Sequence, residues 1–122
     1  MAYSLRRRFS CPVELALEIL SGKWKTVILA HLKQRSMRYE ELRARIPSLT
    51  DKMLTQRLAD LEELGLVVRH KTGGRGSRSW YELTPRGRSL RPVLQGLYDW
   101  GDSIAGEVGA IIEVPRSVLM IR

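Results

Sequence analysis

Residues 51–64 have the most regular helical pattern in the chain, and they predict one amphipathic helix. Thr50 can cap its first turn, and Gly65 supplies the left-handed residue at which helices commonly end. Its apolar face consists of three leucines spaced by four and three residues, Leu54, Leu58 and Leu61. The segment therefore predicts a helix of fixed length that needs a core to pack on.

Three shorter helices are predicted before it, over residues 12–20, 23–33 and 39–46, from apolar residues at helical spacing. Pro47 forces a turn after the third, because the residue before a proline is pushed out of the helical region. His31 falls on the mostly apolar stripe of the second helix. There we expect a core histidine whose hydrogen bonds are satisfied, and not a ligand.

Two β-rich runs follow, residues 66–71 and 78–83, and a glycine-rich segment joins them. This pattern predicts a hairpin with a long tip. A last helix is predicted from Thr84-Pro85 to about Ile104, with a kink at the internal Pro92. Residues 106–122 are apolar in places and stay unassigned.

Composition narrows the class of protein. The 122 residues suffice for one domain, and 43% hydrophobic with 28% charged residues is ordinary for a soluble globular chain. No stretch approaches the roughly 20 apolar residues of a membrane span, and the basic residues 1–10 lack the apolar stretch of a signal peptide. The single cysteine, Cys11, cannot form an internal disulfide. We expect a cytoplasmic protein without metal or cofactor.

The charge balance points to a polyanionic partner. The net charge is +8, and 16 of the 21 basic residues are arginine, whose planar fork pairs well with phosphate. Residues 69–91 hold seven cations against Glu82 alone, which is +6 of the total. Arg86, Arg88 and Arg91 suit phosphate contacts and ordinary surface roles about equally.

Two short helices joined by a turn, then a hairpin with a basic tip, suggest a mainly α winged helix-turn-helix fold. With Leu54 facing the core and 100° per residue, Lys52 and Gln56 point outward, with Thr55 beside them. Gln can pair with adenine, Lys can donate to guanine, and the Thr methyl can meet a thymine methyl. A solvated helix face would look the same in isolation, and the neighbouring elements favour DNA reading.

The predicted DNA contacts fall into two groups. Those of the reading helix are Thr50, Lys52, Met53, Thr55, Gln56 and Arg57. Those of the hairpin and the backbone contacts are Arg38, Lys71, Arg75 and Arg78. Arg75 and Arg78 flank the glycine-rich tip, from which they could follow a phosphate backbone or enter a minor groove.

The chain resembles the HxlR family of bacterial transcription regulators over residues 11–101. Seven motifs carry the resemblance: Cys11-Pro12-Val13-Glu14, Gly22-Lys23-Trp24-Lys25, Met37-Arg38-Tyr39-Glu40-Glu41-Leu42, Met53-Leu54-Thr55-Gln56-Arg57-Leu58, Leu61-Glu62-Glu63-Leu64-Gly65-Leu66-Val67, Tyr81-Glu82-Leu83-Thr84 and Tyr98-Asp99-Trp100-Gly101. The resemblance implies a homodimer on a palindromic operator, with the N- and C-terminal helices at the dimer interface. The family often has Pro-Pro-Arg-Val-Glu-Tyr entering the last strand, where this chain has Gly76-Ser77-Arg78-Ser79-Trp80-Tyr81.

Dimerisation also has a physical argument. Five residues of the last helix recur at spacings of 4, 3, 4 and 3, a seam suited to helix packing: Leu90, Leu94, Leu97, Gly101 and Ile104. The first helix, apolar on most faces, is the second expected contributor. The alternative for both helices is packing within one chain.

Cys11 lies just before Pro12, at a helix N-terminus, where a thiolate is favoured. Some members of the family that the chain resembles use a cysteine at this place to sense oxidants, so a redox response is one hypothesis and a small buried thiol is the other. Pairing Cys11 with His31 or His70 as an enzyme nucleophile and base lacks an orienting acid. We therefore predict that the chain is not an enzyme.

The sequence thus predicts a basic arm over residues 1–10, a winged helix-turn-helix domain over residues 11–105 and a tail over residues 106–122. Its predicted function is sequence-specific regulation of transcription through double-stranded DNA, with Cys11 as a candidate redox sensor. The alternative is a basic protein that coats RNA or the nucleoid without operator specificity.

Overall fold

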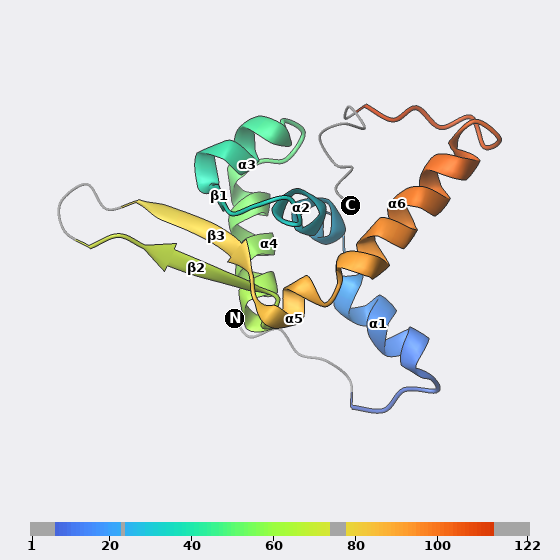
Figure 1. Ribbon diagram of the computed structural model, residues 1–122, viewed down its shortest axis with the longest axis horizontal. Helices are drawn as coiled ribbons and strands as arrows, with labels where there is room; N and C mark the ends of the chain where they lie inside the picture. Colours follow the sequence, from blue (N-terminus) through green and yellow to red (C-terminus); the bar gives the residue numbers. More distant parts are fainter. Residues whose placement is uncertain (1–6, 23, 74–77, 114–122) are drawn as a thin grey trace.

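The computed structural model describes residues 7–22, 24–73 and 78–113, and Figure 1 shows how they are arranged. The helices are α1 (Pro12–Leu20), α2 (Lys25–Leu32), α3 (Tyr39–Arg45), α4 (Asp51–Glu63), α5 (Pro85–Arg88) and α6 (Arg91–Ala105). The strands are β1 (Met37–Arg38), β2 (Val67–Lys71) and β3 (Ser79–Leu83). The mainly helical fold with a small β-hairpin agrees with the prediction.

The sheet has three antiparallel strands in the order β1-β3-β2. The predicted hairpin is present, with Val67 opposite Leu83 and Lys71 opposite Ser79. β1, in contrast, was not predicted. It is two residues long, too short to show the alternating pattern by which a strand is recognised in sequence.

The core lies between the sheet and helices α2, α3 and α4. The three leucines of α4 are buried there, as predicted, and both ends of α4 follow the expected rules. The Thr50 side chain accepts a hydrogen bond from the Met53 amide at 3.1 Å. At the other end, Gly65 has φ +75°, and the Leu66 amide donates to the Leu61 carbonyl at 3.0 Å in a Schellman arrangement.

The start of α2 differs from the prediction. Trp24 has φ +83°, a left-handed conformation that non-glycine residues rarely adopt, so the helix begins at Lys25 and not at residue 23. The buried Lys25 ammonium donates to the Ile19 carbonyl at 2.8 Å, near the C-terminus of α1. A cation suits that end of a helix because the unsatisfied carbonyls there carry partial negative charge.

The predicted last helix is two helices. α5 ends at Arg88, and α6 begins at Arg91 with Pro92 in its first turn, so the proline starts a helix and does not kink one. Gly87 explains the separate turn, because a Cβ there would lie 2.1 Å from the Leu66 carbonyl oxygen. α5 therefore packs directly on the backbone that joins α4 to β2.

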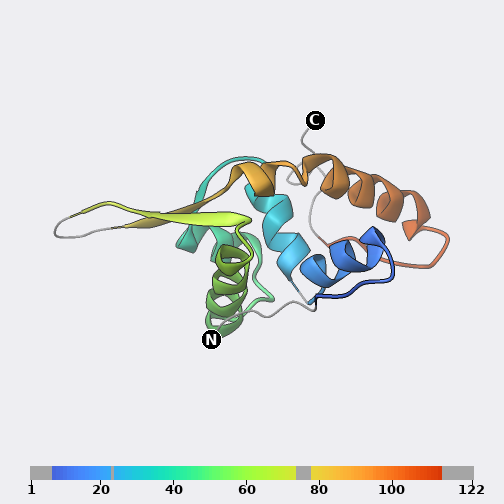
Figure 2. The same cartoon turned by 90° about the horizontal axis from the view of Figure 1, so that it is seen from below.

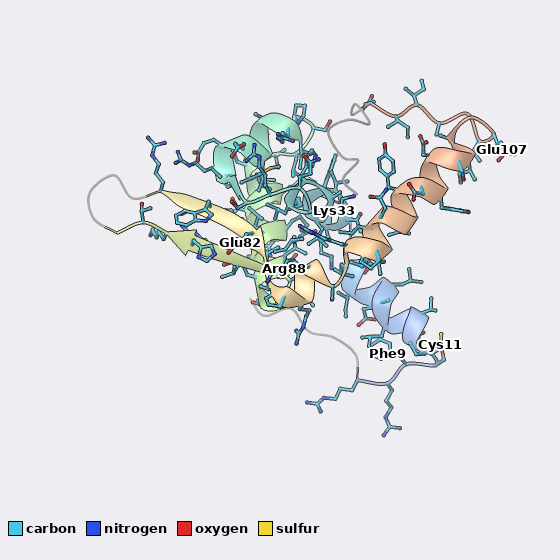
Figure 3. All side chains as sticks on the ribbon, viewed as in Figure 1. Phe9, Cys11, Lys33, Glu82, Arg88 and Glu107 are labelled. Carbon is cyan, nitrogen blue, oxygen red and sulfur yellow. The ribbon has the colours of Figure 1, made fainter. Side chains whose placement is uncertain are left out.

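The two ends of the molecule differ in character. The β2-β3 hairpin projects to one side, whereas α1 and α6 extend to the other, as both ribbon views show (Figures 1 and 2). Lys33 lies in between, where its ammonium donates to Gln95 of α6 at 3.1 Å (Figure 3).

His31 is fully buried, as its place on the apolar stripe predicts, but it is not satisfied. Neither ring nitrogen has a hydrogen-bond partner among the described residues. Burial, helped by the charge of Arg45, lowers its pKa from 6.5 to about 4. The expectation of a satisfied histidine is thus wrong, because no described group lies in hydrogen-bond geometry with either ring nitrogen.

The lowered pKa predicts an acid-sensitive fold. In the unfolded chain His31 takes up a proton below about pH 6.5, whereas in the folded chain it does so only near pH 4. Between these two values the unfolded state binds more protons than the folded state, so the free energy of unfolding falls as the pH drops. The loss should reach about 3 kcal/mol. Urea unfolding at pH 7 and pH 4.5 should show this loss in the native chain and in His70→Gln, the matched control. His31→Leu should remove it, and an unchanged loss in that variant would contradict the assignment.

Candidate nucleic-acid interface

The outward face of α4 carries the residues predicted for it. Lys52, Thr55 and Gln56 are exposed, whereas Met53 is half-buried and packs against the core. Thr50 is exposed and serves as the cap of the helix. The first two turns of α4 therefore present one cation, one hydroxyl-bearing side chain and one amide to the outside.

A polar cluster joins α3 to the start of α4. The Tyr39 hydroxyl lies 2.8 Å from the Asp51 carboxylate and 3.3 Å from the Thr55 hydroxyl, and Arg43 donates to the same carboxylate at 2.8 Å. The hydrogen bond from Tyr39 and, to a smaller extent, the one from Arg43 lower the pKa of Asp51. Desolvation raises the pKa of Tyr39. The cluster fixes the two helices relative to each other, and sequence spacing alone did not reveal it.

A second network lies one turn further along α4. The Gln56 amide nitrogen is 3.1 Å from Oδ1 of Asp60, and Arg57 Nε is 3.2 Å from Oδ2. Asp60 is buried, whereas the neighbouring acids Glu62 and Glu63 are exposed. Arg57, a predicted DNA contact, is thus partly engaged within the helix.

The hairpin exposes basic side chains beside its tip. Lys71 and Arg78 are exposed, and the Arg78 amide donates to the Thr72 hydroxyl at 2.8 Å, closing the two strands. Arg69 donates to the Ser79 hydroxyl at 2.9 Å. Arg75, which was predicted to contact DNA, lies outside the described residues. The remaining backbone candidate, Arg38, is exposed on β1.

Three other arginines of this basic segment hold the fold. Arg86 donates to the Leu64 carbonyl at 3.0 Å, Arg88 to the Leu83 carbonyl at 2.8 Å and Arg91 to the Lys33 carbonyl at 3.1 Å. From the sequence, phosphate contacts and ordinary surface positions were about equally expected for these three residues. Their bonds favour a structural role, which leaves the hairpin cations as the better candidates for phosphate.

Trp80 of β3 contacts a ring on the neighbouring strand β2. Its ring stacks on His70 with centroids 5.2 Å apart, and His70 Nε2 donates to the Glu82 carboxylate at 2.6 Å. Arg38 lies opposite Trp80 in the register. Aromatic stacking therefore adds a side-chain contact between β2 and β3, in addition to their backbone pairing.

The surface of α1 and α6 is apolar, but its seam differs from the prediction. Leu94 is buried within the chain, and Leu90 packs against the core. Gly101 and Ile104 are half-buried, and Leu97 is exposed. The exposed stripe of α6 consists instead of Val93, Leu97 and Trp100.

Cys11 lies at the outer end of α1, as Figure 3 shows. It is a free, exposed cysteine in the cap position of the helix, where its side chain makes no capping hydrogen bond. Within a single chain, the thiol is therefore exposed and not buried in the core.

Together these elements define a class of protein. A helix-turn-helix of α3 and α4, followed by a basic hairpin, is the winged helix-turn-helix arrangement of transcription regulators. The described helices include none long and apolar enough to cross a membrane.

Comparison with known proteins specifies the family. The model of the HxlR-like helix-turn-helix family matches residues 19–108. The uncharacterised HTH-type transcriptional regulator YtcD of Bacillus subtilis (strain 168) is 37% identical over 112 residues, covering 88% of this chain and 89% of YtcD. The chain belongs to the HxlR family, and its relatives are transcription regulators.

Two solved structures share the fold. The redox regulator HypR in its reduced form is 34% identical, with a TM-score of 0.78, over 81% of this chain and 98% of that one. The reduced form of the transcriptional regulator YodB from B. subtilis is 30% identical, with a TM-score of 0.70, over 81% and 98% of the two chains. Both support a regulator that binds DNA.

Proposed function

We propose that this protein is a sequence-specific regulator that binds a palindromic operator in double-stranded DNA as a homodimer. The observation that carries the proposal is the outward face of α4, where Lys52, Thr55 and Gln56 occupy the first two turns. In this fold class the corresponding helix enters the major groove with its N-terminal residues against base edges. Asp60, an acid that would oppose DNA, is turned inward to Arg57.

The alternative, a basic protein that coats RNA or the nucleoid, needs positive charge but no ordered reading face. Here Thr55 and Gln56 are both held by other side chains, through Tyr39 and Asp60. Side chains held in place lose less entropy on binding, which favours specific over random contacts. Ordered polar groups on α4 therefore support the regulator.

Selection from a random duplex library should enrich a two-fold symmetric motif whose half-sites lie about 34–36 Å apart. The selected site should bind roughly a thousandfold more tightly than random DNA. Lys71→Ala and Arg78→Ala should weaken binding to both DNAs alike and lower the slope of log affinity against log salt by about 0.9 each. Arg78→Lys is the matched control, because it keeps the charge. Tight binding without any enriched motif would favour the coating protein.

The homodimer is proposed from the apolar face at the other side of the molecule. None of the nine residues of α1 is buried, and Val13 and Leu17 are each more than 60% exposed. The exposed stripe of α6 adds Trp100, which is 65% exposed. Contiguous apolar surface of this kind marks an interface, and a second copy would bury the same face on both chains.

Leu97→Asp should convert the dimer to a monomer, because the carboxylate would lose its water in the apolar interface. Light scattering coupled to size exclusion measures the mass. Ala44→Asp adds the same charge at an exposed position of α3 and should leave the dimer intact. A dimeric Leu97→Asp chain would argue against this interface.

A redox response through Cys11 is the finer part of the proposal. It is supported by the exposed thiol at a helix N-terminus and by one structural relative, HypR, that is named as a redox regulator. An oxidant such as diamide would accept two electrons and two protons as two thiols form one disulfide, either between two Cys11 residues or with a small thiol.

Treatment with diamide should change operator affinity on the order of tenfold or more in the native chain, and dithiothreitol should reverse the change. Cys11→Ser should bind the operator equally with and without the oxidant. Equal binding by the native chain under both conditions would exclude the response while leaving the regulator proposal standing.

A further inference from the structure

The amide of Gln56 is held by a buried carboxylate. Its nitrogen lies 3.1 Å from Oδ1 of Asp60, one helical turn away, while Oδ2 of Asp60 pairs with Arg57 Nε at 3.2 Å. Asp60 is only 9% exposed, although Gln56 itself is exposed. One oxygen of the Asp60 carboxylate thus contacts the exposed Gln56, and the other contacts the cation of Arg57.

This geometry decides which way the amide points. An ionised carboxylate can only accept hydrogen bonds, so the NH₂ group of Gln56 must face Asp60, and its carbonyl oxygen must face away. Flipping the amide would bring two oxygens together. The ion pair with Arg57 holds the Asp60 carboxylate in place. If the Gln56 amide rotated, the carboxylate would therefore not move with it.

Base edges in the major groove respond differently to such an amide. Adenine offers an amino donor at N6 and cytosine one at N4, whereas guanine and thymine present only acceptors at the corresponding position. A fixed carbonyl oxygen matches the first pair and repels the second. Because the second N–H of the amide stays available to adenine N7, adenine should rank first and cytosine next.

We propose that Asp60 is a positioning residue that fixes the Gln56 amide, so that Gln56 selects a base with an exocyclic amino group and rejects guanine and thymine. The inference rests on the proposed function, since it concerns a base contact of α4. An unrestrained glutamine could turn over and donate to guanine instead. The specificity at this operator position would therefore come from a residue that does not touch DNA.

The test is selection of sites from a random duplex library, followed by affinity measurements with each of the four bases at one position. That position is identified by Gln56→Ala as the one at which base preference disappears. The native chain should favour adenine over guanine there by roughly tenfold, the effect of one hydrogen bond.

Asp60→Asn keeps the shape of the side chain but lets the amide turn either way. Its preference for adenine over guanine should fall to about threefold or less, while other positions stay unchanged. In the Gln56→Ala background, Asp60→Asn should change nothing at this position, which a general loss of stability would not reproduce. Glu62→Gln removes an equal charge from an exposed site of α4 and is the matched control.

A position read by Gln56 that prefers guanine or thymine would overturn the inference, as would an Asp60→Asn chain with unchanged preference. A motif that Gln56→Ala leaves intact would overturn it too, with the regulator proposal standing. The absence of any motif would instead overturn the proposed function, and this inference with it.

Discussion

Burial of one face of α4 orients both the core and the outward surface of the molecule. Leu54, Leu58 and Leu61 are each at most 1% exposed, and burying a leucine contributes about 2 kcal/mol. Because a helix turns 100° per residue, fixing those three side chains also fixes the outward direction of Lys52 and Gln56. The Thr50 cap and the turn at Gly65 then set where the outward face begins and ends. The reading surface is thus a consequence of the core.

The same constraint explains which features the sequence could predict. The ends of α4 follow from local chemistry at Thr50 and Gly65, and the hairpin from two β-rich runs about a glycine-rich tip. β1, in contrast, exists because β3 offers it an edge, and two residues carry no pattern of their own. The break before α6 depends on the approach of Gly87 to Leu66. Such features come from contacts between distant segments, which spacing along the chain does not encode.

For the candidate interface, the sequence predicted which side chains of α4 point outward better than it predicted their hydrogen-bond partners. The helical wheel placed Lys52, Thr55 and Gln56 outward, as observed. It did not show that Tyr39 reaches Thr55 from α3, because that contact joins residues sixteen positions apart. Charge counting likewise located the basic segment but treated its cations as equivalent. Arg86, Arg88 and Arg91 donate to backbone carbonyls, so the position of each guanidinium, and not the net charge of the segment, separates them from the hairpin cations.

The division of the molecule into two faces follows from its size. A single small core cannot cover every apolar side chain of the described helices. Here the core is formed mainly by α2, α3 and α4 with the sheet. Val13, Leu15 and Leu17 of α1 and the outer stripe of α6 are left exposed, on the side opposite the hairpin. If two copies join through that side, each presents its α4 and hairpin away from the common axis. The surface that one chain cannot bury would then set the spacing of the two reading helices, and Cys11 lies at the outer end of α1, on that same side of the chain.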